Sequence, residues 1–176
     1  KKLADKTSNA DPKLTALLGI LRVAVKLDEN NIVVESANAL LKQGGLTAEE
    51  EKETTFTRAN AYKKLGKTDL ATQDYVSLAK DVLNLYGAQS AVILAEIQYN
   101  EGQLTDAENT LNALIDGGTP HQYWLARGFI LLADVYYKQG NTFEACEYLE
   151  SLKSNYPGEE KDIFKMIDER LNNWKK

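Results

Sequence analysis

Apolar side chains recur at helical spacing through nearly the whole chain. Stretches of roughly 12 to 20 residues carry apolar side chains at i, i+3, i+4 and i+7, as amphipathic helices do. No stretch alternates apolar and polar residues for long enough to form a strand. Turn-forming residues separate the stretches at 28–31, Gly44-Gly45, Gly66, Gly102, Gly117-Gly118, Gly140 and Pro157-Gly158. The pattern predicts an all-α chain in which successive helices are antiparallel neighbours.

Several predicted helices begin at recognisable capping residues. Asp11-Pro12 opens one helix, and Thr47 with Glu50 has the spacing of a capping box, in which each side chain accepts from the other residue's backbone N–H. Residues 119–122 have the spacing of a second box. They would place Pro120 at the first helical position, where its missing N–H costs nothing.

Three turn glycines set a repeat. Gly66, Gly102 and Gly140 lie 36 and 38 residues apart, and each stands where a helix must end and the chain reverse. A fixed period of this length indicates a helical-hairpin repeat. The first unit keeps the period, with Glu29 at the turn where glycine is expected.

The clearest unit carries nine residues of one pattern: Phe129, Leu132, Ala133, Tyr136, Gly140, Ala145, Leu149, Leu152 and Pro157. Its small residues stand where the two helices of a hairpin cross, because only a small side chain allows close approach. This pattern resembles the tetratricopeptide repeat family. The two preceding units match less fully, with Gln98 where tyrosine is usual and Arg58 where leucine is usual.

The resemblance implies a right-handed α-solenoid of three to four antiparallel hairpins. We expect the hairpins at residues 11–45, 46–85, 86–118 and 119–157. Residues 158–176 would form a C-terminal capping helix, because an array needs a terminal element with a polar outer side. Residues 1–10 resemble the end of an upstream helix.

The resemblance also implies a binding site, since the first helix of each hairpin in this family lines a concave groove. The matching inward positions mix aromatic, apolar and charged side chains, which suits a peptide or helix of a partner protein. The alternative is that these side chains form only a solvated face. The predicted groove residues are Phe56, Asn60, Lys63, Gln89, Val92, Glu96, Tyr99, Arg127, Ile130, Asp134 and Tyr137.

Composition argues against several other functions. A net charge of -5 and scattered basic residues disfavour nucleic acid and anionic membranes as partners. The single Cys146 and single His121 exclude an intrachain disulfide and a zinc site built from several such ligands. We expect no cofactor, a packing role for His121 and an inert thiol at Cys146. No apolar run reaches the ~20 residues that span a bilayer.

The sequence therefore predicts a non-catalytic protein-interaction scaffold. One alternative is a structural spacer or docking end of a longer repeat protein, which an exposed apolar patch near residues 14–25 would support. Another is an enzyme or ligand sensor, which would need a deep polar pocket around His121. The start at Lys1 without Met is typical of a fragment or processed product. Resemblance to long-period repeat proteins implies a bacterial cell envelope or periplasmic location.

Overall fold

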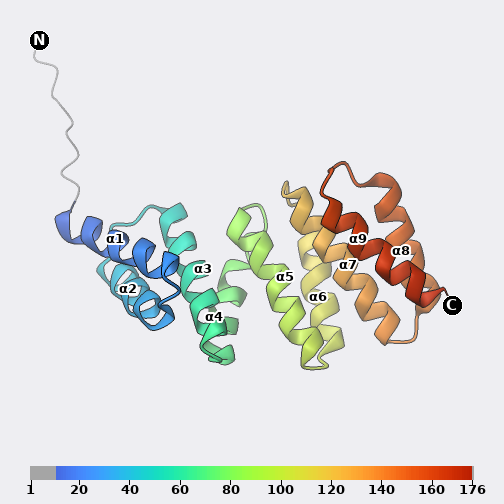
Figure 1. The fold of residues 1–176 in the computed structure, drawn as a ribbon, viewed down its shortest axis with the longest axis horizontal. Coiled ribbons are helices and arrows are strands. Elements are labelled where there is room, and N and C mark those ends of the chain that lie inside the picture. Colours follow the sequence, from blue (N-terminus) through green and yellow to red (C-terminus); the bar gives the residue numbers. More distant parts are fainter. Residues whose placement is uncertain (1–10, 176) are drawn as a thin grey trace, which may run out of the picture. The chain divides into compact units, whose positions relative to one another are not determined.

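The structure is a computed structural model that describes residues 11–175, and this part of the chain is all-α (Figure 1). Residues 1–10, which the sequence assigned to an upstream helix, lie outside the described residues. The helices are α1 (Pro12–Lys26), α2 (Asn30–Gln43), α3 (Ala48–Lys64), α4 (Thr68–Leu78), α5 (Leu85–Asn100), α6 (Leu104–Asp116), α7 (Gln122–Lys138), α8 (Thr142–Asn155) and α9 (Lys161–Trp174). None of the helices in residues 11–175 has the length and apolar character to cross a membrane.

Two of the three predicted helix starts are confirmed. The Asp11 carboxylate accepts the backbone N–H of Lys13 at 2.9 Å, and Pro12 opens α1. Thr47 and Glu50 form the complete capping box, with the Glu50 carboxylate 2.8 Å from the Thr47 nitrogen. These bonds satisfy backbone donors that the first helical turn leaves without partners.

The third predicted start is wrong. Helix α7 begins at Gln122 with His121 as its N-cap residue, and the cap lacks a side-chain hydrogen bond. Thr119 is buried, and its hydroxyl accepts the N–H of His121 at 3.3 Å. This local turn occupies the threonine oxygen, so the helix starts two residues later than a Thr119 cap would allow.

The repeat turns share one backbone conformation. Gly66, Gly102 and Gly140 have φ values of 71°, 78° and 92°, as a helix C-terminus closed by a left-handed residue requires. In the first unit the equivalent residue is Asp28 with φ 58°, not the predicted Glu29. Aspartate tolerates this region because its short side chain bonds locally; the Asp28 carboxylate accepts from the Asn30 amide at 3.3 Å.

The chain divides into two compact units, which we call unit 1 (up to Asp74) and unit 2 (from Tyr75). In unit 1, α2 packs against both α1 and α3. Its core is formed by Leu21, Ala24, Val33, Ala37, Leu40 and Ala61. Arg58, which replaces the usual leucine, is half-buried and donates to Asp74 at 2.6 and 2.8 Å and to Asn38 at 2.8 Å. These bonds satisfy the charge that burial would otherwise penalise.

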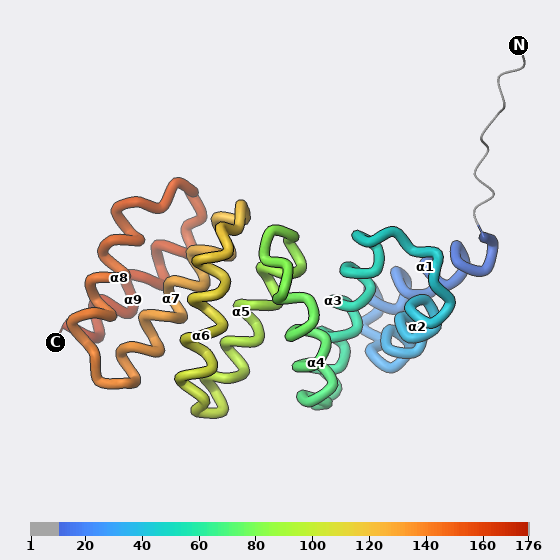
Figure 2. Tube along the Cα trace, turned by 180° about the vertical axis from the view of Figure 1, so that it is seen from behind, coloured from blue at the N-terminus to red at the C-terminus, as the bar shows by residue number. Residues whose placement is uncertain are grey.

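Unit 2 is built from two layers of helices. Helices α5, α7 and α9 pack side by side in one layer, and α6 and α8 form the other (Figure 1, Figure 2). Leu111 and Leu149 are fully buried between the layers. Helix α9 buries Ile163, Ile167 and Leu171 against α7 and α8. Its inner face is therefore apolar.

Candidate functional site

A groove lies between α1 and α3 in unit 1. Two depressions of about 680 and 280 Å³ adjoin there, because Val25 and Thr57 line both. Three predicted groove residues, Phe56, Asn60 and Lys63, line the larger one. We call this pair of depressions the α1–α3 groove.

Helix α1 also supplies groove residues, which are not among the predicted site residues. Arg22, Val25 and Lys26 line the groove opposite α3. The signal that could have found them is the turn residue: counted back from Asp28 rather than Glu29, they fall on the inward positions of the first repeat. The first repeat has no glycine at its turn, so the sequence does not mark its register.

The α1–α3 groove carries positive charge that its own residues balance only in part. Lys64 pairs with Asp28 at 2.6 Å, and both side chains are exposed. This contact lowers the pKa of the Asp28 carboxyl, since Lys64 donates a hydrogen bond to it. In the described part of the chain Lys26 and Lys63 form no ion pair. Glu50 and Glu53 also line the smaller depression, beside Arg22. The groove therefore offers apolar side chains and a small excess of positive charge, with Lys26 and Lys63 as its unpaired ammonium groups among residues 11–175.

In unit 2 the first helices of successive hairpins are neighbours, and the residues at the corresponding positions bond to the neighbouring first helix instead of lining a groove. Glu96 of α5 accepts from Arg127 of α7 at 3.0 Å. Tyr99 of α5 lies under the Lys138 ammonium, which is 4.3 Å from the ring centroid and donates to the Tyr99 carbonyl at 3.3 Å. A predicted groove residue on each helix thus holds the two helices together.

The same arrangement repeats one helix further along. Asp134 of α7 accepts two hydrogen bonds from Arg170 of α9, both at 2.6 Å, and the ring of Tyr137 stacks on Trp174 at 4.3 Å. Burial raises the pKa of Tyr99, and the nearby Asp134 carboxylate adds to the rise. We call these contacts among α5, α7 and α9 the inter-helix ladder.

Two predicted groove residues lie in the core. Val92 is 0% exposed and Ile130 is 2% exposed. Val92 packs with Leu114, and Ile130 packs in the cluster that α9 covers. This burial corrects the sequence-based placement of both side chains, because neither offers surface to a partner. Gln89, the remaining predicted residue, is half-buried.

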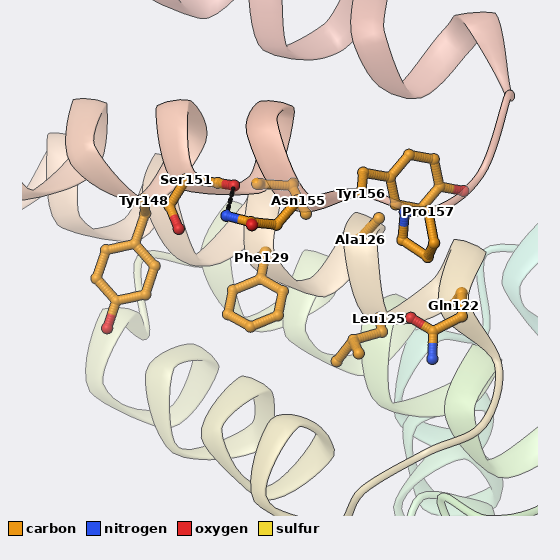
Figure 3. A pocket seen from close by; sticks show the side chains of 10 residues that line it. Gln122, Leu125, Ala126, Phe129, Tyr148, Ser151, Asn155, Tyr156 and Pro157 are labelled. Carbon is orange, nitrogen blue, oxygen red and sulfur yellow. Dashed lines mark hydrogen bonds between the residues drawn. The ribbon is translucent and has the colours of Figure 1, made fainter.

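A separate pocket of about 290 Å³ lies between α7 and α8 (Figure 3). Leu125 and Phe129 point into it from α7, beside Tyr148 of α8. The Asn155 amide on its rim donates to the Ser151 carbonyl at 2.8 Å. The lining is mainly apolar and does not include His121.

His121 and Cys146, the two residues considered for catalysis, have packing roles in the structure. His121 is half-buried, with its Nε2 3.2 Å from the Leu83 carbonyl oxygen, so it joins two loops of unit 2. Cys146 is buried as a free thiol. Among residues 11–175, no group of three or more His, Cys, Asp or Glu side chains is placed to hold a metal ion.

An exposed apolar patch lies on α1; it overlaps residues 14–25 and extends beyond them to Leu27. Ile20, Val23 and Leu27 are 48%, 56% and 67% exposed. Together with Ala16 and Gly19 they line a shallow depression of about 430 Å³, which extends to Ile32 of α2. We call this surface the outer face of α1.

Comparison with known proteins agrees with the fold. The tetratricopeptide repeat model matches residues 129–158, the segment that carries the clearest repeat pattern. A solved structure titled as the crystal structure of MamA protein is similar over 92% of this chain and 88% of that chain, with a TM-score of 0.63 and 18% identity. At that identity the likeness shows the fold alone. No curated protein matches the sequence.

Proposed function

We propose that this chain, which carries a tetratricopeptide repeat at residues 129–158, binds a partner protein through the α1–α3 groove of unit 1. Repeats of this kind generally serve protein interaction rather than catalysis, and a scaffold role fits the all-helical array. The observation that supports the groove is the placement of Phe56, Asn60 and Lys63 around one depression. In unit 2 the corresponding positions are taken up by the inter-helix ladder.

The groove favours an extended or helical segment with an apolar anchor and acidic neighbours. Val25 and Phe56 supply contact area, and an aromatic side chain at the centre of an interface often dominates affinity. Lys26 and Lys63 would attract carboxylates and fix the register of the bound segment. The binding segment we propose is therefore a peptide with a large apolar residue flanked by Asp or Glu.

A capture experiment tests this site. The whole chain and a Phe56→Ala/Lys63→Glu variant serve as parallel baits in a lysate of the source organism, with cross-linking through lysine. The matched control is Phe143→Ala/Lys161→Glu in unit 2, where Phe143 is 80% exposed. We expect a protein that the wild type and the control capture and the groove variant loses, cross-linked at Lys26 or Lys63.

Titration calorimetry with the captured segment then measures the loss. We expect Phe56→Ala to weaken binding ~30-fold, because truncating a central aromatic anchor costs about 2 kcal/mol or more. Circular dichroism of each variant checks that the fold is intact. Equal capture by the wild type and the folded groove variant would rule out the α1–α3 groove as the binding site.

A further inference from the structure

The outer face of α1 occupies positions that other first helices bury. Asp28, Gly66 and Gly140 are equivalent turn residues, so positions counted back from them correspond. We compare the positions twelve, nine and five residues before the turn. In the first repeat, on α1, they are Ala16, Gly19 and Val23. In the second repeat, on α3, they are Thr54, Thr57 and Ala61, and in the fourth, on α7, they are Gly128, Leu131 and Val135.

In the fourth repeat these positions lie on α7, and α6, the second helix of the preceding hairpin, covers them. Leu131 and Val135 of α7 pack with Leu111 of α6, and they are 8% and 0% exposed. Gly128 lies so close to α6 that an added Cβ would stand 2.9 Å from the Leu114 Cδ2 atom. This stripe of α7 is thus the surface on which α6 rests.

In the second repeat, on α3, the two ends of the stripe are buried: Thr54 is 2% exposed, whereas Thr57 between them lines the α1–α3 groove. Ala61 of α3 is 2% exposed and packs with Val33, Ala37 and Leu40 of α2. Two separate interfaces in this chain therefore obey one rule: the stripe receives a second helix. On α1 the stripe is apolar but open, with Val23 56% exposed.

The second helices share a side-chain pattern that defines what fits the stripe. The pattern occupies the positions five, nine and twelve residues after the turn. These residues are Val33, Ala37 and Leu40 in α2; Ala71, Tyr75 and Leu78 in α4; Ala107, Leu111 and Leu114 in α6; and Ala145, Leu149 and Leu152 in α8. The first position is small or β-branched, and the last is always leucine. On α1, Gly19 stands at the position equivalent to Leu131 of α7, and a Cβ added to Gly19 would have no atom within 4 Å. This space favours a large side chain at the middle position of the incoming helix.

We propose that the outer face of α1 docks a further helical hairpin of this repeat type, whose second helix lies on α1 as α6 lies on α7. That helix presents a small residue, a large apolar residue and a leucine at the spacing given above. A second folded copy of this chain does not offer it, because within each copy the first two of these positions are buried and the leucines are buried or half-buried. The inference does not depend on the α1–α3 groove, which lies on another side of α1.

A fusion protein tests the docking. Residues 84–121, which contain α5 and α6, replace residues 1–9, so that residue 121 precedes residue 10 and the added α6 meets α1 at the spacing by which α6 meets α7. Hydrogen exchange of the α1 backbone amides is then compared with the unfused chain. We expect exchange in α1 to slow by at least ~10-fold, because a packed helix opens less often than one with a solvated face.

Val23→Asp is the matched control. It should restore the fast exchange of α1 in the fusion and leave exchange in the unfused chain unchanged, since Val23 is exposed there. Equal exchange with and without the added hairpin would overturn the proposal. A fused hairpin that adds no helical circular dichroism would also count against it, because docking is what would fold it. Concentration-dependent dimers of the unfused chain that Val23→Asp dissociates would instead identify a second copy as the occupant.

Discussion

The first-helix faces of the two units use equivalent positions for different purposes. In unit 2, Glu96, Tyr99, Asp134 and Tyr137 bond to the helix that follows and form the inter-helix ladder. In unit 1, Arg22 of α1 and Lys63 of α3 stand at matching positions and line the α1–α3 groove. The difference teaches that a position in a repeat fixes where a side chain points, while the neighbouring helix decides whether it stays available.

The largest expected effect separates the core of unit 2 from the groove of unit 1. Leu111→Ala should lower the free energy of unfolding by about 2–5 kcal/mol, because it leaves a cavity where a fully buried side chain packs against α7. Lys63→Ala should change it by less than ~0.5 kcal/mol, as most exposed substitutions do. Urea unfolding followed by circular dichroism measures both. A Leu111→Ala loss under 1 kcal/mol would contradict the packing of α6 on α7.

The next effect compares two side chains six residues before the turn. Asp134→Ala should cost about 1.5–3 kcal/mol, because it removes two charge-assisted hydrogen bonds and leaves Arg170 without its partner. Arg22→Ala should cost less than ~1 kcal/mol, since its side chain is exposed on the α1–α3 groove. A double-mutant cycle with Arg170→Ala isolates the pair. Additive losses in that cycle would show that the ladder contributes no coupling there.

The smallest effect concerns the aromatic end of the ladder. Tyr137→Ala should cost about 0.5–1.5 kcal/mol, because the Tyr137 ring stacks on Trp174 although it is 41% exposed. Tyr137→Phe keeps the stacked ring and should cost almost nothing. Thermal unfolding of the two variants measures the difference. If both variants lose the same stability, the hydroxyl and not the stacking would be the source.

Much of the fold could be predicted because its signals are local. The capping box at Thr47 and the turn glycines act within a few residues of themselves, so the sequence carries them directly. The first turn was predicted one residue late, at Glu29 instead of Asp28, because a left-handed backbone is usually marked by glycine and this turn has none. The Thr119 cap failed because a local turn competed for the same hydroxyl.

The site was harder to predict because its availability depends on distant residues. Counting along the repeat gave the inward positions, and three of them do line one groove. It could not show that Arg127 would reach Glu96 or that Arg170 would reach Asp134, since these partners lie 31 and 36 residues away. The pattern that could have indicated the inter-helix ladder is an acidic residue on one helix and an arginine on the helix that packs beside it, as in Glu96 with Arg127 and Asp134 with Arg170.

The stacking of Tyr137 on Trp174 has a spectroscopic consequence. The chain has two tryptophans, Trp124 and Trp174, and both lie in unit 2. Intrinsic tryptophan emission therefore reports directly on unit 2 and not on unit 1. A tryptophan introduced at Phe56 would give unit 1 an optical probe of its own, placed at the site where we expect the partner to bind.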